Sequence, residues 1–318
     1  MTTTRRTLLT AVFGGGLAVG LSACGGANSN PLNNASSSAA AGASGSSASG
    51  TGTLVVGSAN FPENALLAQI YADALTAKGV TTSTTLNIGS RELYIGALDD
   101  GSIDVIPEYT GNLARYFTKG QADISTPAAA LASLKKALPS NLTVLQPSTA
   151  QDSDSICVTA ATAQKYSLTS ISDLAGHAQT MVIGGPPEFK TRVDGLQGLK
   201  RVYGLTFKDF RPLDAAGALT VTALKNGQVQ AANLFTTDPQ VAANHFVVLK
   251  DPKHLFGAQN VIPLLRKDKV TDTITSTLNA VSAKLDTSTL LSLVTKVVID
   301  KQDPTAVSKQ FLTGAGLA

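Results

Sequence analysis

The sequence predicts an α/β fold made of two lobes. From residue 53 to the C-terminus, short apolar runs typical of strands alternate with segments whose apolar residues follow helical spacing. This repeated β-then-α order favours mainly parallel sheets with helices on both faces. Residues 53–318 also exceed the length at which one hydrophobic core usually divides, so we expect two lobes.

The first half of this segment contains clear helix and strand signals. The run 54–57 predicts a buried strand, and a helix follows it with Asn60 as N-cap, Pro62 at the first helical position and Gly79 as its end. Further along, the pattern predicts strands over 82–88 and 103–106 and helices over 91–98 and 127–138.

The second half repeats the alternation. The pattern predicts strands over 180–183, 229–233 and 247–249, and helices over 189–203 and 219–225. In sheets of this kind, ligands bind beyond the C-terminal ends of the strands. Ser58 and Ser90 each follow a strand at that end, where a capping role competes with ligand contact.

The N-terminus has the pattern of a bacterial lipoprotein signal. Arg5 and Arg6 precede an apolar stretch over residues 8–21 that is too short to span a bilayer, and small residues lead into Cys24. We expect residues 1–23 to be removed and Cys24 to be lipidated, which anchors the chain at the extracytoplasmic face of the cell membrane. The alternatives are a chance cysteine after a secretory signal and an N-terminal core helix. The paired arginines fit twin-arginine as well as Sec export.

Residues 24–52 predict a flexible tether. After Cys24 the segment consists almost entirely of Gly, Ala, Ser, Asn and Thr, and it has no aromatic or acidic residue. Such a composition cannot bury enough apolar surface to order itself. The tether would let a globular head meet a partner above the membrane.

Charge and histidine content exclude several function classes. The chain has 25 Lys and Arg against 22 Asp and Glu, and removal of the signal takes away two arginines, which leaves almost no net charge and no electrostatic case for nucleic-acid binding. His177, His245 and His254 are widely spaced and lack a ligand pattern, so we predict no metal and no cofactor.

Cys157 is the only cysteine besides the predicted anchor, so no disulfide is expected within the mature fold. A buried strand cysteine is favoured, with a reactive thiol as the alternative.

Several segments resemble the substrate-binding proteins of osmoprotectant ABC transporters, which take glycine betaine, choline, carnitine and related quaternary amines. The segments that carry the resemblance are 57–63, 87–90, 101–111, 171–174, 184–192, 194–196, 203–205 and 236–238. Together they span essentially all of residues 53–318. The resemblance implies a periplasmic-binding-protein fold, in which two βαβ lobes joined by two crossover strands close on a ligand in the cleft between them.

The resemblance also implies a domain organisation and a role. Lobe I would comprise residues 53–156 and lobe II 157–258, with 259–318 returning to lobe I and adding C-terminal helices, and the hinges would lie near 155–160 and 255–262. The role would be that of a monomeric solute receptor, without enzymatic activity, that delivers a small molecule to an ABC permease. The alternative is an exported lipoprotein enzyme, although no Gly-x-Ser-x-Gly motif is present and no histidine has an evident nucleophile partner.

Candidate ligand contacts follow from the chemistry of a quaternary ammonium. This cation has no N–H to donate and is held by aromatic faces, whereas a carboxylate end needs basic donors. The resemblance implies Tyr109 as the cage residue of the first lobe and Arg192 as the carboxylate contact of the second; a core tyrosine and a solvated arginine are the alternatives. The further candidates are Asn112, Asp152, Thr110 and Ser58.

The second half departs from the family pattern. No tyrosine or tryptophan follows Tyr203, Val221 stands where a cage tyrosine is expected, and the later segment offers only Phe246 and Phe256. Ala59 replaces a side chain that the family often has long and polar. We therefore expect an incomplete cage that binds betaine weakly, which leaves a different solute as the alternative ligand.

Overall fold

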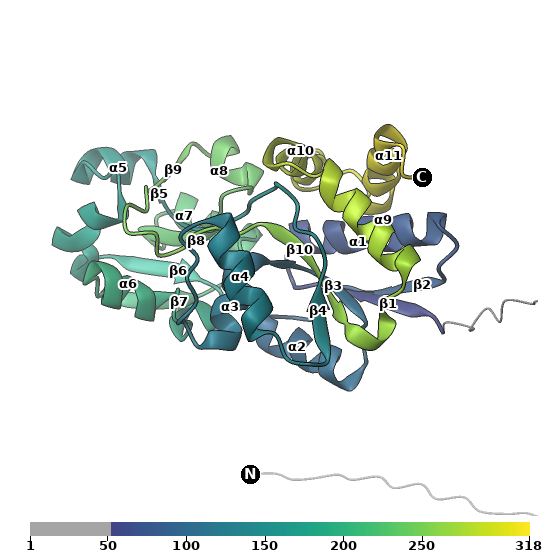
Figure 1. Cartoon of the computed structure of the whole chain (residues 1–318). Coiled ribbons are helices and arrows are strands. Elements are labelled where there is room, and N and C mark those ends of the chain that lie inside the picture. The colour runs from purple at the N-terminus through teal and green to yellow at the C-terminus, as the bar shows by residue number, and fades with distance from the viewer. Residues whose placement is uncertain (1–51) are drawn as a thin grey trace, which may run out of the picture. The chain divides into compact units, whose positions relative to one another are not determined.

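The computed structural model describes residues 52–318 (Figure 1). The predicted signal peptide, the predicted lipidation site Cys24 and all but the last residue of the predicted tether lie outside the described residues. Across residues 52–318, none of the helices has the length and apolar character needed to span a membrane.

Two five-stranded sheets form the framework of the described residues. The first sheet has the order β2-β1-β3-β10-β4, with β1 at Leu54–Gly57, β2 at Thr82–Thr85, β3 at Val105–Tyr109, β4 at Leu142–Val144 and β10 at Val261–Arg266. The second has the order β7-β6-β8-β5-β9, with β5 at Asp154–Thr159, β6 at Val182–Gly185, β7 at Asp209–Pro212, β8 at Ala231–Phe235 and β9 at Phe246–Val248.

Each sheet is mixed and not mainly parallel, so that part of the prediction is wrong. In the first sheet β1 pairs in parallel with β2 and β3, but β10 runs antiparallel to β3 and β4. In the second, β6 pairs in parallel with β7 and β8, but β5 runs antiparallel to β8 and β9. The reason is connectivity, because β5 and β10 each arrive from the other sheet without the helical crossover that makes neighbours parallel.

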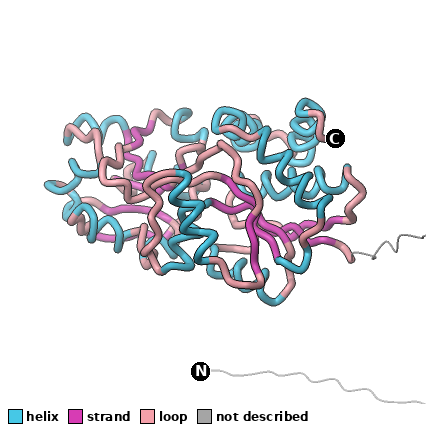
Figure 2. The backbone as a smooth tube through the Cα atoms, in the orientation of Figure 1, coloured by secondary structure: helices cyan, strands magenta, loops and turns pink. Residues whose placement is uncertain are grey.

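Helices cover both faces of each sheet, and buried apolar side chains form two main clusters around each one. Around the first sheet lie α1 (Pro62–Ala77), α2 (Arg91–Asp100), α3 (Thr110–Thr118), α4 (Pro127–Ala137), α9 (Asp272–Lys284), α10 (Thr287–Val298) and α11 (Pro304–Ala315). Around the second lie α5 (Ala160–Tyr166), α6 (Leu196–Tyr203), α7 (Ala218–Lys225) and α8 (Pro239–Ala243). Figure 2 shows the strands as two groups flanked by these helices.

Three of the observed strands lie slightly C-terminal to the predicted ones. The strands predicted over 103–106, 180–183 and 229–233 are observed as β3, β6 and β8, each of which begins and ends a little later along the chain. Consequently Tyr109 is the last residue of β3 and Phe235 is the last residue of β8. Both rings therefore lie at the sheet edge where α/β folds place their ligands.

Helix α1 begins at Pro62, as predicted, but its N-cap differs from the prediction. Its N-cap is Phe61 and not Asn60, and no side chain caps it. The amide of Asn64 turns back instead, and its Oδ1 accepts the N–H of Ala59 at 2.7 Å. Gly79, the predicted end, adopts a φ of 82°, a conformation that favours glycine.

The helix predicted over 189–203 is wrong in its first part, because a 3₁₀ turn and a reversal precede α6. Gly195 allows this reversal: a Cβ at that position would overlap the carbonyl oxygen of Phe189. The turn that results carries Arg192 and Asp194, whose positions differ from those in a continuous helix.

Two neighbouring segments connect the lobes. Residues 145–153 lead from β4 to β5, and residues 249–260 lead from β9 to β10. Between them, Ala150 O accepts the N–H of Val261 at 3.0 Å, and an antiparallel bridge joins Gln151 to Asn260. The predicted boundary between residues 156 and 157 falls inside β5, and the predicted hinge at 155–160 covers most of β5 and the first residue of α5; both elements already belong to the second lobe.

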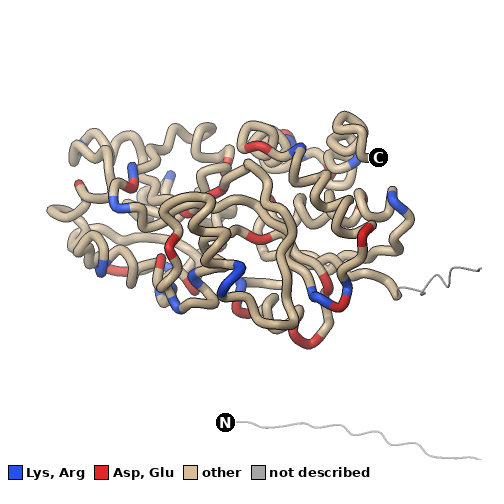
Figure 3. The backbone as a smooth tube through the Cα atoms, in the orientation of Figure 1, with Lys and Arg blue, Asp and Glu red and all other residues tan. Residues whose placement is uncertain are grey.

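Charge and thiol positions agree with the composition. Figure 3 shows basic and acidic positions interspersed along the backbone of residues 52–318. Cys157 lies fully buried in β5, as predicted, and burial raises the pKa of its thiol to about 11. A thiol with that pKa stays protonated and unreactive near neutral pH.

Candidate functional site

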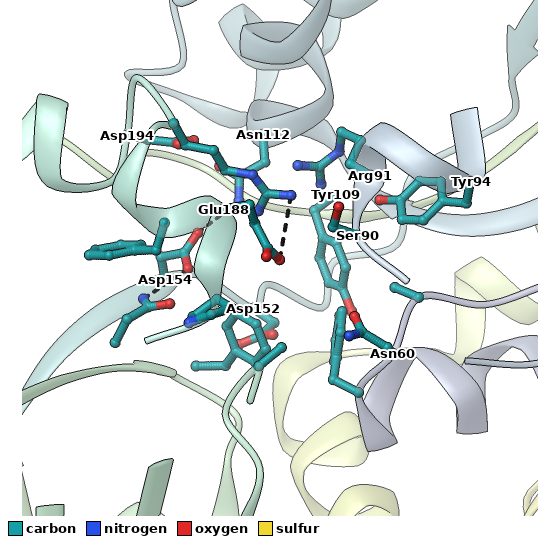
Figure 4. A pocket seen from close by; sticks show the side chains of 18 residues that line it. Asn60, Ser90, Arg91, Tyr94, Tyr109, Asn112, Asp152, Asp154, Glu188 and Asp194 are labelled. Atoms are coloured by element: carbon teal, nitrogen blue, oxygen red, sulfur yellow. Dashed lines mark hydrogen bonds and ion pairs between the residues drawn. The ribbon is translucent and has the colours of Figure 1, made fainter. Parts of the chain in front are cut away.

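A cavity lies between the two lobes, at the C-terminal ends of β1, β3, β6 and β8 (Figure 4). About 650 Å³ of empty space lies within it, including the solvent at its open mouth. The residues labelled in Figure 4 as lining it are Asn60, Ser90, Arg91, Tyr94, Tyr109, Asn112, Asp152, Asp154, Glu188 and Asp194.

Most of the sequence-predicted contacts meet in this cavity, namely Tyr109, Arg192, Asn112 and Asp152. Ser58 and Thr110 are not among its lining residues. The Oγ of Ser58 accepts the N–H of Asn87 at 2.8 Å, and the Oγ1 of Thr110 accepts the N–H of Asn260 at 3.1 Å. Both hydroxyls therefore support the backbone around the cavity.

Aromatic rings from both lobes line the cavity. Phe61 stands between Tyr109 of the first lobe, with ring centroids 6.1 Å apart, and Phe235 of the second, with centroids 4.8 Å apart. Tyr94 and Phe189 add two further rings to the lining. The aromatic contribution of the second lobe is thus made by phenylalanines, whose faces carry the same negative quadrupole as tyrosine.

The positions at which the sequence suggested a lost cage residue lie elsewhere. Val221 is buried in an apolar cluster on the second sheet, together with Phe246, and neither residue lines the cavity. Phe256 belongs to another cluster of the same lobe. Only Ala59 among these positions lines the cavity, where its small side chain leaves space.

Arg91 lines the cavity but is already paired. Its guanidinium binds both carboxylate oxygens of buried Glu108, at 2.7 and 2.9 Å. Glu108 also accepts the hydroxyl of Tyr94 at 2.6 Å and the N–H of Tyr109 at 2.8 Å. This network fixes the rings of the first lobe, and the positive charge of Arg91 is neutralised by Glu108.

Arg192 joins the two lobes across the cavity mouth. Its Nε and Nη2 lie 3.2 and 3.1 Å from the carboxylate of Glu92 on α2, and its Nη2 lies 3.9 Å from Glu188. Partial burial disfavours the charged form of Glu92, but the hydrogen bonds and charge of Arg192 outweigh it and hold the pKa of Glu92 at about 2. The positive charge of Arg192 is therefore matched by protein carboxylates.

Asn112 also connects the lobes. Its Nδ2 donates to Asp154 Oδ2 at 2.9 Å, and Asn233 of β8 donates to Asp154 Oδ1 at 3.0 Å. Gln259 of the second connecting segment donates to Asn112 Oδ1 at 2.7 Å. The carboxylate of Asp154 is thereby held at the junction of α3, β5 and β8.

A buried pair of acids, Glu63 and Asp152, lies beside Tyr109. Asp152 Oδ1 accepts the N–H of Thr237 at 3.1 Å, and the hydroxyl of Thr237 donates to Glu63. Burial raises the pKa of both carboxyls, and the charge of Glu63 raises the pKa of Asp152 further. The pair thus holds a proton to higher pH than two exposed acids would.

Acidic side chains outnumber basic ones in the cavity lining. Asp152, Asp154, Glu188 and Asp194 stand against Arg91 and Arg192. Burial, followed by the charge of Asp154, raises the pKa of Asp194. This balance favours a ligand with a positive group. No three His, Cys, Asp or Glu side chains in residues 52–318 gather in a way that could hold a metal ion.

Sequence reasoning missed several lining residues because it followed the tyrosines. Phe61 lies in segment 57–63 and Phe235 directly precedes segment 236–238, and both segments carry the family resemblance. Arg91 follows Ser90 at a strand end and could have been found in the same way. Nothing local distinguishes Asp194, whose placement depends on the chain reversal at Gly195.

Comparison with known proteins gives the family. The family model for the substrate-binding domain of ABC-type glycine betaine transport systems matches residues 52–314. The chain belongs to this family. The glycine betaine-binding protein YehZ of Escherichia coli K12 is 30% identical over 275 residues, covering 82% of this chain and 90% of its own. A glycine-betaine-binding protein of Pseudomonas aeruginosa is also 30% identical, covering 82% of this chain and 87% of its own.

A solved structure confirms the fold of this family member. A glycine betaine/carnitine/choline ABC transporter protein superposes with a TM-score of 0.64 at 23% identity, and the match covers 83% of this chain and 99% of that one. The predicted two-lobed, periplasmic-binding-protein fold is therefore confirmed. The relatives are solute-binding proteins of transport systems, which act outside the cytoplasm.

Proposed function

We propose that this chain is a lipid-anchored receptor that captures a small quaternary amine and delivers it to an ABC importer. The observation that carries the proposal is the cavity between the lobes, which combines aromatic faces from both lobes with an excess of acidic side chains. That combination suits a cation without N–H donors, because ring faces and carboxylates attract its charge and the cation has no N–H that needs an acceptor.

The proposed ligand belongs to the class of glycine betaine, choline and carnitine. Support comes from the relatives, whose names state glycine betaine. The rings of Phe61, Tyr109 and Phe235 would contact the methylated ammonium, while Asp152 and Asp154 would supply negative charge close by. The phenylalanines replace the tyrosines that the sequence lacked, so we propose a complete aromatic wall in place of the incomplete cage expected earlier.

The proposed role is that of a non-enzymatic monomer at the extracytoplasmic face of the membrane. Two lobes joined by two connecting segments suit hinge closure on a ligand, with the hinges at residues 145–153 and 249–260. Lipidation of Cys24 would hold the receptor beside its permease, and the tether would let the lobes reach it.

Calorimetry with choline and its neutral isostere 3,3-dimethylbutanol tests the proposal. The two molecules share a shape, so a site built for a cation should bind choline at least about tenfold more tightly. Glycine betaine and carnitine complete the panel, and solution scattering should show a more compact molecule when a ligand binds. Equal binding of choline and its isostere, or no binding by the whole panel, would contradict the quaternary-amine proposal.

A further inference from the structure

A second cavity adjoins the first. The two share four lining residues, Arg91, Asn112, Arg192 and Asp194. Beyond these, the second cavity is lined by Arg115 and Tyr116 of α3 and the following Lys119, by the turn before Gly195, and by Glu92 of α2, whose carboxylate pairs with Arg192. A ligand in the aromatic cavity could therefore extend past Asn112 into the second one.

The basic side chains of the two cavities differ in their partners. Arg91 and Arg192 each have a carboxylate within hydrogen-bonding distance, as described above. Arg115, one helical turn after Asn112 on α3, makes no ion pair among the described residues. Lys119 also lines the second cavity, and it is exposed to solvent. Arg115 is thus a half-buried arginine that lines the second cavity without forming an ion pair among the described residues.

The hydrogen bonds of Arg115 leave part of its guanidinium without a partner. Nη1 donates to the carbonyl oxygen of Leu255 in the second connecting segment. Nε is buried without a hydrogen-bond partner in the described structure, and none is recorded there for Nη2. Burial lowers the pKa of Arg115, and the charge of Asp194 opposes this. An anionic group next to Nη2 would offset this cost of burial.

Asp194 supplies the opposite charge between the two cavities. It is buried and lines both, and no hydrogen bond or ion pair is recorded for its carboxylate within residues 52–318. The shared wall therefore presents a negative group, and the second cavity presents a positive one at Arg115. This polarity suits a zwitterion whose cation lies in the aromatic cavity.

We infer that the binding site continues into the second cavity, and that Arg115 receives the carboxylate of a zwitterionic quaternary amine. The inference rests on the proposed function, since it takes the aromatic cavity as the site of the cation. It assigns to Arg115 the role that the sequence resemblance suggested for Arg192. A ligand whose carboxylate is separated from the ammonium by several bonds suits this arrangement better than a compact one.

Calorimetry with carnitine and carnitinamide on the full chain tests the inference. The two probes differ only in that an uncharged amide replaces the carboxylate. Arg115→Gln should raise the Kd of carnitine about tenfold or more, because a charge-assisted contact is lost, and should change that of carnitinamide by less than about twofold. Arg115→Lys should recover part of the carnitine affinity, since it keeps the charge. Arg211→Gln, an exposed change on β7, is the control and should alter neither Kd.

The outcomes separate the two proposals. If Arg115→Gln weakens both probes equally, Arg115 acts only through Leu255 and the inference is wrong; an unchanged Kd for carnitine overturns it as well. If the unaltered chain binds choline but not carnitine, the proposed function stands and the inference falls. If it binds no quaternary amine, both fall. A melting temperature for each variant shows whether the lobes remain folded.

Discussion

The hydroxyl of Tyr109 donates a 2.7 Å hydrogen bond to Glu63 Oε1, so the ring at the end of β3 is held by the first turn of α1. Tyr109 is buried, and Phe61 packs against its ring. Position and polarity of this ring are therefore set by the protein before any ligand arrives, which limits the ordering cost of binding.

Two substitutions of Tyr109 separate its hydrogen bond from its ring. Tyr109→Phe leaves a buried carboxyl oxygen of Glu63 without its donor, and we expect the free energy of unfolding to fall by about 1–3 kcal/mol with little change in the Kd of choline. Tyr109→Ala should weaken choline binding as well, by about 0.5–2 kcal/mol. Urea unfolding and calorimetry measure the two effects. Unchanged affinity in Tyr109→Ala would remove this ring from the site.

Phe235 and Val221 form a matched pair in the second lobe. Phe235 lines the cavity, whereas Val221 is buried in the core of the same lobe. We expect Phe235→Ala to raise the Kd of choline roughly threefold to thirtyfold, and Val221→Ala to lower the free energy of unfolding by about 1–3 kcal/mol without changing Kd. Calorimetry on both variants measures the Kd of choline. A larger increase of Kd in Val221→Ala than in Phe235→Ala would show that Val221, and not Phe235, contacts the ligand.

Stability should depend on pH through Glu63 and Asp152. Burial raises the pKa of both carboxyls above their values in the unfolded chain, which are about 4. Above about pH 4, the folded state therefore binds more protons than the unfolded state. The contribution of these two carboxyls to the free energy of unfolding is complete below about pH 4 and is lost as pH rises through their folded-state pKa values. Asp152→Asn should flatten this fall in urea unfolding measured from pH 4 to 8.

The affinity for a cation should change in the opposite sense over the same range. As Asp152 loses its proton, the cavity gains negative charge, so choline binding should strengthen with rising pH. The dependence of the Kd of choline on pH should be weaker in Asp152→Asn.

Asp173 is a contrasting case, because backbone hydrogen bonds from Thr169 and Ser170 hold its pKa at about 2. Its contribution to stability is present above about pH 4 and is lost toward pH 2, so Asp173→Asn should leave the dependence of the Kd of choline on pH unchanged.

The ion pair between Glu92 and Arg192 should favour the closed form for every ligand. We expect Glu92→Gln and Arg192→Gln each to raise the Kd of choline and of carnitine by a similar factor, about twofold to fivefold, as for a partly exposed pair. The double variant should be little worse than either single one, since the two side chains act together. Calorimetry on all four proteins gives this coupling. A loss confined to carnitine in Arg192→Gln would restore Arg192 as the carboxylate contact.

Membrane attachment should depend on Cys24. Cys24→Ala removes the sulfur to which lipid would be attached, so the exported chain should move from the membrane fraction to the soluble extracytoplasmic fraction. Fractionation and mass spectrometry of the mature N-terminus measure this. A variant that still fractionates with the membrane would show that something other than Cys24 holds the chain there.

The fold could be predicted from sequence largely because strand and helix signals are local. Apolar runs and spacing located six of the ten strands and five of the eleven α-helices of residues 52–318, in whole or in part. Sheet direction was not predictable, because it depends on where β5 and β10 enter from the other lobe. The break before α6 depends on a close approach between Gly195 and Phe189, a tertiary contact with no periodic pattern of its own.

The candidate site was predictable only where a motif carried it. Tyr109 and Asn112 lie in one conspicuous segment and line the cavity together. The second-lobe rings could not be predicted from tyrosine content, because phenylalanines such as Phe235 line the cavity on that side. The ion pairs of the arginines could not be predicted from the sequence either. Arg192 pairs with Glu92, whereas Arg115 has no acid partner in the described residues.

The tyrosines that line the cavity give the protein an optical signal of its own. The chain has no tryptophan and six tyrosines, so its ultraviolet emission comes from tyrosine alone. Tyr94 and Tyr109 line the cavity, and each hydroxyl is hydrogen-bonded to a buried glutamate, Glu108 or Glu63, a contact that commonly quenches phenol fluorescence. A ligand that contacts these rings would change the emission of a large share of the fluorophores, so binding can be followed without a label.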